Sequence, residues 1–197
     1  MVVDKPAGLL SVPGRGAGKQ DCVAARVQRA FADALVVHRL DMATSGLFLM
    51  ARGSPAQRAL SAAFAGCAVE KRYEAVVAGL VDGDEGTIDL PLIADWPNRP
   101  RQRVDFQLGK PSRTRWRVLV RDAAAQRTRV ELEPVTGRSH QLRVHLRAIG
   151  HPILGDALYA PAAVQDPAGR LMLHATRLAF AHPATGEPMS FYSPTPF

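Results

Sequence analysis

Short apolar runs bounded by glycine, proline and polar residues recur along the whole sequence. Alternating or continuous apolar runs of this length are typical of strands buried on one or both faces. Three such runs lie at Val2-Val3, at a strand end formed by Val36-Val37, and from Gly46 to Ala51. We therefore expect a strand-dominated α+β protein. The further predicted strands cover residues 70–78, about 101–107, 114–121, 127–134, 171–181 and 188–193.

The first segment with apolar residues at helical spacing covers about residues 21–32. Val23, Val27 and Phe31 fall on one face of this predicted helix. Asp21 precedes the first apolar position, and aspartate is a favoured N-cap because its side chain accepts hydrogen bonds from free backbone N–H groups. We expect a helix capped by Asp21.

A second helix is predicted to begin at Ser54-Pro55-Ala56-Gln57. This tetrapeptide has the form of a capping box, with proline at the first helical position. Leu60 and Phe64 mark its buried stripe, and Gly66 is expected to end it.

The third predicted helix follows Thr136 and carries two arginines. Arg143 and Arg147 are four positions apart and are expected beside the buried stripe of this helix, not within it. The stripe itself consists of Leu142, Leu146 and Ile149.

The tetrapeptide His38-Arg39-Leu40-Asp41 lies between two segments predicted to be buried strands. A carboxylate at this place is expected on a loop that core elements hold on both sides. A buried aspartate that satisfies loop amides is the structural alternative. The functional alternative is a carboxylate that is positioned for chemistry.

Composition limits the class of protein. With 197 residues and 47% hydrophobic content, the chain can bury a full core, and we expect one domain over residues 1–197. No apolar run reaches the roughly 20 residues that span a membrane, and no signal sequence is recognisable, so we expect a cytoplasmic protein without a membrane partner. Cys22 and Cys67 are too few and too far apart for a disulfide framework or a metal pair.

The net charge of +7 favours an anionic partner such as nucleic acid. Only four of the 25 basic residues are lysine, although a GC-rich genome would explain this arginine excess without any function. The arginines cluster over 99–103 and 113–117. Each cluster is interpreted either as a solvated face or as a phosphate-binding surface.

Several common catalytic motifs are missing from the sequence. It contains no nucleophile elbow, no phosphate-binding loop of the Walker type and no dinucleotide glycine fingerprint. The histidines lack zinc-ligand spacing, and most of them are expected to be structural hydrogen-bonding groups. We therefore expect a mechanism without cofactor or metal. The six histidines are His38, His140, His145, His151, His174 and His182.

Five blocks of the sequence resemble, in the same order, the motifs of RluA-family pseudouridine synthases. The central block runs from His38 to Gly46 and is similar to the family pattern HRLDxxTSG. Together the blocks cover nearly the whole chain, which makes chance agreement a poor explanation. The other four are KPAGLLSVPG from Lys5, KRYEAVVAG from Lys71, residues 136–159 with GRSHQLRVHL and GHPILGDALY, and LMLHA from Leu171.

The resemblance implies a fold and a site. It implies the pseudouridine synthase fold, with a mixed, mostly antiparallel central sheet, flanking helices and an active-site cleft. It assigns the catalytic carboxylate to Asp41, kept ionised by direct contact with Arg143, and a base-stacking or proton-relaying role to Tyr73. Arg39 is expected to fill the space of a flipped base. The further residues expected to bind RNA are His38, Arg138, Gln141, Leu142, Arg99, Arg101 and Arg103.

The resemblance also bears on the substrate. The segment DWPNRP at residues 95–100 resembles the subgroup that acts on large-subunit ribosomal RNA and on the anticodon loop of transfer RNA, although it is also a plausible proline-stiffened turn. We expect a monomer with RNA as its partner. The chain has Asp4 where the family more often has asparagine, and we expect no S4-like domain. It starts almost on the first motif, so an upstream strand is either lost from the sequence or replaced by a shorter sheet edge.

Two other classes of function are compatible with a basic, cofactor-free protein. An RNA-binding or RNA-chaperone protein would have no need for Asp41, Tyr73 and Arg143 together. A hydrolytic glycosylase would normally need a second carboxylate opposite the first. The conspicuous motif supplies one acid among several cations, which fits an enzyme that retains the cleaved base.

Overall fold

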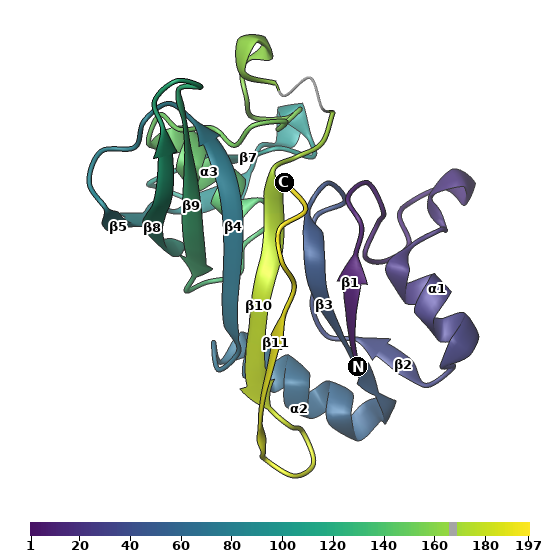
Figure 1. Cartoon of the computed structure of the whole chain (residues 1–197). Helices are drawn as coiled ribbons and strands as arrows, with labels where there is room; N and C mark the ends of the chain where they lie inside the picture. The colour runs from purple at the N-terminus through teal and green to yellow at the C-terminus, as the bar shows by residue number, and fades with distance from the viewer. Residues whose placement is uncertain (166–168) are drawn as a thin grey trace. The chain divides into compact units, whose positions relative to one another are not determined.

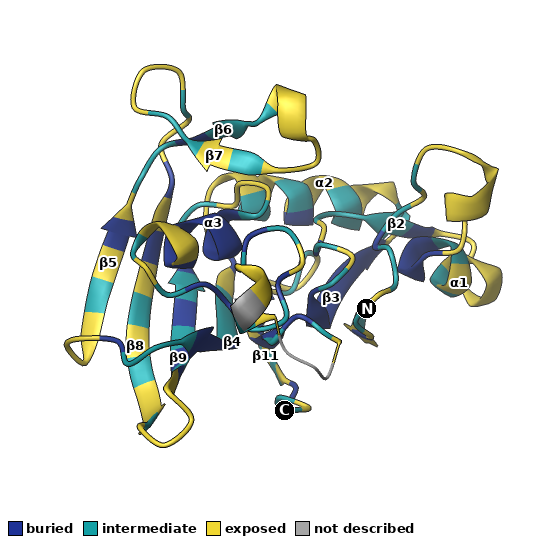
Figure 2. Cartoon of the chain, turned by 90° about the horizontal axis from the view of Figure 1, so that it is seen from above, coloured by how far each residue is buried: buried dark blue, intermediate teal, exposed yellow. Residues whose placement is uncertain are grey.

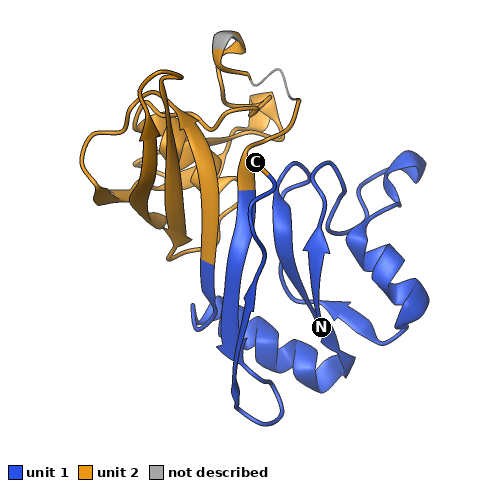
Figure 3. Ribbon diagram, viewed as in Figure 1, with its two compact units in different colours: residues 1–71, 174–196 blue, residues 72–173, 197 orange. Residues whose placement is uncertain are grey.

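The computed structural model describes residues 1–165 and 169–197 (Figure 1). It divides into two compact units (Figure 3). Unit 1 contains Met1–Lys71 and His174–Pro196, and unit 2 contains Arg72–Leu173 together with Phe197. The expectation of a single domain over the whole chain stays a prediction.

The sheet of unit 1 is centred on β3, which is buried from Ser45 to Ala51. Strands β1 and β2 pair antiparallel with β3, and β11 pairs antiparallel with β10. The pairing of β10 with β3 is parallel, so this sheet is mixed and mostly antiparallel. Its strands are β1 (Val2–Lys5), β2 (Ala34–Val36), β3 (Ser45–Arg52), β10 (Leu173–Ala181) and β11 (Pro188–Tyr192).

A glycine permits the parallel pairing of β3 with β10. Gly46 has a φ of 107°, and a Cβ atom added to it would lie 2.4 Å from the carbonyl oxygen of Ala175. Both the left-handed backbone and the close approach exclude a side chain here. Gly46 lies five residues after Asp41, so this contact fixes where the Asp41 loop enters the sheet.

Helix α1 (Val23–Ala30) is shorter than predicted and is capped by a different residue. The Sγ atom of Cys22 accepts the cap hydrogen bond from the backbone N–H of Ala25 at 3.3 Å. Asp21 instead forms an ion pair with Arg26 at 2.7 Å. The prediction of an Asp21 cap is therefore wrong, because this carboxylate binds an arginine one turn into the helix.

Helix α2 (Gly53–Ala65) ends at Gly66, as predicted, but the predicted capping box is wrong. The helix starts one residue before Ser54, and no side chain forms a cap bond. The side chain of Gln57 donates to the carbonyl of Val36 at 3.0 Å, so it is not available to the helix start.

Helix α2 packs against the sheet of unit 1 through an apolar core cluster. Leu60 is 3% exposed, and Phe64 is partly buried against the same cluster. This confirms the predicted buried stripe of α2. The buried members of the cluster are Leu47, Leu49, Ala51, Leu60, Val69, Leu178 and Phe180.

The larger sheet of unit 2 is antiparallel, in the order β4–β9–β8–β5. The predicted strands over 70–78 and 127–134 are confirmed at both ends, whereas β5 was not predicted. The strands are β4 (Glu70–Ala78), β5 (Glu85–Asp89), β8 (Arg113–Asp122) and β9 (Arg127–Pro134).

A separate two-stranded hairpin, which we call the β6–β7 arm, consists of β6 (Leu92–Ala94), β7 (Gln102–Val104) and the turn between them. The predicted strand over 101–107 is therefore too long. It ends early because the carboxylate of Asp105 accepts hydrogen bonds from the backbone N–H groups of Gln107 and Leu108, which turns the chain. The turn that joins β6 to β7 is exposed (Figure 2).

Helix α3 (Gln141–Ala148) lies against β7, β8 and β9. Leu142 and Leu146 are buried, as predicted. Arg147 is exposed, but Arg143 is only 4% exposed, so the placement of Arg143 beside the buried stripe is wrong. Short 3-10 helices complete the described structure at η1 (Ala17–Lys19), η2 (Trp96–Asn98) and η3 (Ala162–Val164).

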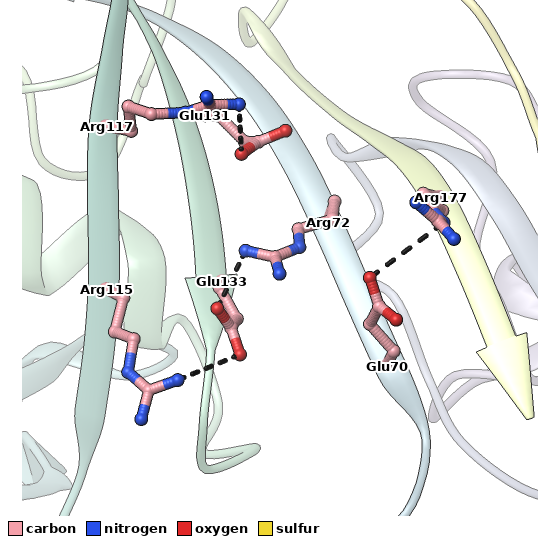
Figure 4. A network of polar contacts seen from close by, with 7 residues as sticks. All are labelled: Glu70, Arg72, Arg115, Arg117, Glu131, Glu133 and Arg177. Carbon is pink, nitrogen blue, oxygen red and sulfur yellow. Dashed lines mark hydrogen bonds and ion pairs between the residues drawn. The ribbon is translucent and has the colours of Figure 1, made fainter.

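The arginines of β8 face carboxylates on neighbouring strands (Figure 4). Arg117 pairs with Glu131 at 3.1 Å, and Arg115 lies 3.4 Å from Glu133, which also pairs with Arg72. Arg113 pairs with Asp89 at 2.6 Å. These pairs favour the interpretation of the 113–117 cluster as a solvated strand face, because its charge is balanced within the protein.

Across the described residues, none of the helices has the length and apolar character needed to cross a membrane. Cys22 is buried and Cys67 is exposed, and both are free thiols.

Candidate active site

Asp41 lies in unit 1, on the loop that joins β2 to β3. The hydroxyl of Ser11, which is 3% exposed, donates to the Leu40 carbonyl at 2.7 Å and accepts from the Leu40 N–H at 3.1 Å. On the other side, the N–H of Thr44 donates to the Asp41 carbonyl at 3.1 Å. The backbone is thus fixed immediately before and after the carboxylate.

Lys5 is a buried cation beneath this loop. The residue is only 1% exposed. Its Nζ donates to the carbonyls of Pro6 at 2.9 Å, Leu9 at 2.7 Å and Met42 at 2.9 Å. These bonds use all three donors of an ammonium group. Burial lowers the pKa of Lys5 to about 8, and the nearby Asp41 carboxylate opposes this shift. Lys5 therefore clamps the entry segment to the Asp41 loop.

His38 supports the same loop as a neutral ring. Its Nε2 accepts a hydrogen bond from the backbone N–H of Leu49 at 2.8 Å, which requires that nitrogen to be unprotonated. The ring stacks on Phe64, with centroids 4.5 Å apart. Burial, with a smaller contribution from the Lys71 ammonium, lowers the pKa of His38 to about 3. The predicted role of His38 in RNA binding stays a prediction beside this structural role.

A hydrogen-bonded chain of four side chains crosses unit 1 from β3 to β1. The hydroxyl of Ser193 donates to the Asp4 carboxylate, which can only accept. His174 Nε2 therefore donates to Ser193 at 3.0 Å, and in the neutral ring Nδ1 accepts from the Ser45 hydroxyl at 2.8 Å. Asp4, where the sequence departs from the resembled motif, thus sets the direction of the chain.

In unit 2, Arg143 forms a bidentate pair with Asp156. The Nε of Arg143 donates to Oδ2 at 2.8 Å, and one Nη donates to Oδ1 at 2.7 Å. The side chains are 5% and 0% exposed, respectively. Asp156 Oδ1 also accepts from the backbone N–H groups of Leu158 and Tyr159. The position of this guanidinium is therefore set by a fully buried carboxylate.

Tyr159 connects Arg143 with the β6–β7 arm inside unit 2. Its ring lies under the guanidinium of Arg143, whose Cζ is 5.1 Å from the ring centroid. Its hydroxyl accepts from the backbone N–H of Gln102 at 2.7 Å and contacts Nδ1 of His140 at 2.7 Å. His140 is the N-cap of α3 and has a positive φ of 53°, so Tyr159 secures a left-handed residue at the start of the helix that carries Arg143.

The other predicted residues of unit 2 differ in their burial. Tyr73 is partly buried on β4, where Ala75 and Val77 are fully buried. Leu142 is 7% exposed, and Gln141 is 4% exposed. The Gln141 amide bonds internally, to Thr136, Arg138, Arg113 and Thr114. In the structure, Leu142 is packed inside the unit and Gln141 forms hydrogen bonds there. Roles for both residues in RNA binding stay predictions.

The predicted arginines that would touch RNA are all exposed. Arg39 is exposed in unit 1. In unit 2, the Nε of Arg138 donates to the carbonyl of Pro111 at 3.3 Å, and Arg103 pairs with Asp105. Arg99 and Arg101, the other two arginines predicted to bind RNA, are also exposed. The expected ion pair of Asp41 with Arg143 would join residues of different units, and it stays a prediction.

Sequence reasoning missed several supporting residues. Lys5, Asp156 and Tyr159 all lie in the resembled motifs, but no role was assigned to them. The signal for Asp156 was a charged residue within the apolar segment GHPILGDALY, which requires a buried partner. Ser11 gave no such signal, since a small hydroxyl residue is common in loops.

Each of the six histidines takes part in a hydrogen bond, in keeping with the prediction that most of them are structural hydrogen-bonding groups. His145, for example, is fully buried and contacts the Thr114 hydroxyl and the Leu90 carbonyl, both at 3.0 Å. Burial lowers the pKa of His145, which keeps its ring neutral. Within residues 1–165 and 169–197, no group of three or more His, Cys, Asp or Glu side chains is placed to hold a metal ion.

The sequence aligns with those of known proteins along its whole length. The family model described as RNA pseudouridylate synthase matches residues 1–148. The chain is 53% identical over 191 residues to the dual-specificity RNA pseudouridine synthase RluA of Yersinia pestis, covering 97% of this chain and 92% of that protein. It is 51% identical to the protein of the same name from Escherichia coli K12, covering 100% and 90% of the two chains.

Solved structures agree with the sequence comparison. Human RNA pseudouridylate synthase domain containing 1 aligns with a TM-score of 0.82 and 29% identity, covering 100% of this chain and 80% of its own. Human RNA pseudouridylate synthase domain containing 4 aligns with a TM-score of 0.77 and 24% identity, covering 99% of this chain and 85% of its own, and supports the same fold. The predicted pseudouridine synthase fold is therefore confirmed. The chain belongs to the RNA pseudouridylate synthase family, and it is an enzyme that isomerises uridine in RNA.

Proposed function

We propose that this enzyme modifies a loop uridine in two RNAs, large-subunit ribosomal RNA and the anticodon stem-loop of transfer RNA. The observation that carries the proposal is the match, over the full chain and at 51% identity, to a relative named a dual-specificity RNA pseudouridine synthase. The segment at residues 95–100, which resembles the dual-substrate subgroup, supports it. A cytoplasmic location and a monomeric state are part of the same proposal.

The reaction rearranges one nucleotide without losing any heavy atom. The N1–C1′ bond of uridine breaks, the detached base turns, and a C5–C1′ bond forms. The C5 proton is released, and N1 takes up a proton. Such a reaction needs a group that activates the ribose, a pocket that retains the free base, and a group that accepts the C5 proton.

Asp41 is the proposed group at the ribose. It acts either as a nucleophile at C1′ or as the base that removes a ribose proton to give a glycal. Arg143 supplies the cation that pairs with this carboxylate through charge-assisted hydrogen bonds. Tyr73 stacks on the uracil and accepts or relays the C5 proton. No cofactor or metal takes part in this scheme.

The base must leave its stack before Asp41 can reach the ribose. Extrusion costs a few kcal/mol and is cheapest where the base is already unpaired, which makes RNA loops the natural substrates. Arg39, exposed two residues before Asp41, is proposed to occupy the vacated place.

The decisive experiment measures tritium release from uridine labelled at C5. The substrates are a transfer RNA anticodon stem-loop, a large-subunit ribosomal RNA hairpin, and a linear control with the same loop sequence. Release from both hairpins is the expected result. Release from only one would reject the dual assignment, and equal release from the linear strand would reject recognition of loop shape.

A cellular experiment complements the assay. Chemical mapping of pseudouridine in RNA from cells with and without the gene identifies the modified positions. Loss of one site in ribosomal RNA and one in transfer RNA is expected. A single lost site would leave a synthase with one target.

A further inference from the structure

The turn at the end of the β6–β7 arm presents an exposed aromatic ring beside unbalanced positive charge. Trp96 is 68% exposed, and the guanidinium of Arg99 lies over its ring. Arg101 follows at the end of the same turn and is also exposed. We call residues 95–101 the arm tip.

Within the described part of the chain, no carboxylate pairs with Arg99 or Arg101. The acidic residue of the tip, Asp95, accepts instead from the side chain of Asn98 at 2.9 Å. Arg103 on the adjacent strand does pair with Asp105 at 2.9 Å. The two tip arginines therefore differ from the neutralised arginines of β8, and their charge favours a phosphate-bearing partner.

The tip has a defined conformation before any ligand binds. The N–H of Asp95 donates to the Arg101 carbonyl at 2.9 Å, and the N–H of Arg101 donates to the Asn98 carbonyl at 3.0 Å. Pro97 occupies the first turn of η2. A fixed loop loses little conformational entropy on binding, so an exposed ring placed on it binds more tightly than one on a mobile loop.

The arm is also anchored to the helix of Arg143 within unit 2. Leu92 and Val104 pack with Val144 of α3 and with Tyr159. The Tyr159 hydroxyl accepts from the backbone of Gln102 at 2.7 Å, and its ring lies under Arg143. The arm tip is therefore carried by a hairpin that is packed against α3.

We propose that Trp96, backed by the Arg99 guanidinium, is a stacking platform for an unpaired base of the substrate RNA. The guanidinium covers one face of the indole, and the exposed remainder of the ring accepts a base. Arg99 and Arg101 hold the phosphates that flank this base. Every base has a π-face, so such a platform selects unpaired nucleotides without reading their identity. This inference rests on the proposed function, because it assigns part of the RNA contact of the same enzyme.

The first test compares three exposed-residue variants of the full chain on a stem-loop that the wild type modifies. Removing an aromatic partner of a stacked base weakens binding by about tenfold to a hundredfold, so Trp96→Leu should raise Kd and KM in this range and leave kcat nearly unchanged. Trp96→Phe keeps a ring and should retain most of the affinity. Tyr192→Leu removes a ring that is 69% exposed in unit 1 and should have no effect.

The second test observes the ring directly. The chain has two tryptophans, so Trp116→Phe leaves Trp96 as the only indole emitter. Titration with the stem-loop should quench this emission, whereas a fully paired RNA duplex should not. An unchanged emission at saturation would overturn the proposal, as would Trp96→Leu binding that matches the wild type or Tyr192→Leu.

Different measurements test the proposed function and the stacking platform. If the wild type binds the stem-loop but releases no tritium from C5-labelled uridine, the proposed function fails. If the wild type forms pseudouridine while Trp96→Leu keeps the wild-type Kd and KM, only the stacking platform is rejected. Circular dichroism of each variant verifies that the fold is retained.

Discussion

In unit 1 the loop of Asp41 is held through its backbone, whereas in unit 2 Arg143 is held through its charged side chain. Ser11 bonds the main chain of Leu40, and Lys5 bonds the carbonyl of Met42. Arg143, by contrast, forms a bidentate pair with the buried Asp156. Two groups proposed for one reaction are thus positioned by different physical means.

The difference fits their proposed roles. A reactive carboxylate needs its oxygen atoms for chemistry, so its position is best set through the main chain on either side. A supporting cation can be fixed through its own charge, because a guanidinium has five N–H donors and a bidentate pair engages only two of them. Substitution of Asp41 itself should therefore separate activity from stability, whereas substitution of Asp156, which fixes Arg143, should combine them.

The largest expected effect is the loss of activity in Asp41→Asn. Turnover should fall by more than about a thousandfold, which corresponds to roughly 4 kcal/mol of transition-state stabilisation. The free energy of unfolding should change by less than about 1 kcal/mol, since the loop is held by the backbone of its neighbours. Tritium release and urea denaturation measure the two quantities. Asp33→Asn, an exposed acid of the same unit paired with Arg52, is the matched control. Retained turnover would contradict an essential carboxylate.

Asp156→Asn should have the next largest effect, and it should act first on stability. The substitution leaves the guanidinium of Arg143 buried without its counter-charge, which costs about 3–5 kcal/mol. Activity should fall as well, because the position of Arg143 is no longer fixed. Asp89→Asn breaks an exposed pair with Arg113 and should cost no more than about 1 kcal/mol. Equal losses in the two variants would show that burial does not matter to this pair.

Ser11→Ala tests the support of the Asp41 loop without touching a charge. The buried N–H and carbonyl of Leu40 lose their shared hydroxyl partner, which should cost about 2 kcal/mol of stability. The value of kcat should fall more than affinity for RNA, because the loop carries Asp41, the proposed reactive group. Ser54→Ala, at an exposed hydroxyl that forms no cap bond, should change stability by less than about 0.5 kcal/mol. A larger loss in Ser54→Ala than in Ser11→Ala would contradict this account.

The smallest expected effect is the acid sensitivity that His38 confers. The unfolded chain binds a proton at His38 near the ordinary pKa of 6.5, whereas the folded pKa is about 3. The unfolded state therefore holds more protons between these values, and the free energy of unfolding falls as the pH falls through this window. From pH 7 to pH 5.5 the contribution of this one group should be about 1.3 kcal/mol.

His38→Gln isolates that contribution. A glutamine side chain can accept the Leu49 N–H bond without titrating, so the variant should lose less stability between pH 7 and pH 5.5 than the wild type. Urea unfolding at the two pH values provides the comparison. An equal pH dependence in both proteins would assign the acid sensitivity to another group.

Elements with a strong apolar pattern were predictable from the sequence alone. Strands β4 and β9 match their predicted bounds, because their buried residues recur over enough positions to define a strand. Strand β5 has only one large apolar residue, Ile88, and β6 is only three residues long, so neither gives a recognisable pattern. Helix starts were less predictable, since Asp21 and Gln57 each form a tertiary or side-chain bond that competes with capping.

The candidate site was predictable only where a motif names the residue. Helical spacing placed Arg143 beside the apolar stripe, and nothing local shows that Asp156, 13 positions further on, buries it. The pairing of Arg113, Arg115 and Arg117 with carboxylates of other strands was equally hidden, because cross-strand register is not visible in a single sequence. In the sequence, the arginines of the arm tip look the same as those of β8, although their surroundings in the structure differ.

The division of the chain also has a consequence for the order of synthesis. Unit 2 is a nearly continuous stretch between the two parts of unit 1 (Figure 3). During translation, the Asp41 loop leaves the ribosome early, but Ser45 and Gly46 pair with His174 and Ala175, near the end of the chain. Unit 2 can thus complete its internal pairing while unit 1 still lacks two strands. A prematurely terminated chain would carry the Asp41 loop without strand β10, which pairs with β3 directly after this loop.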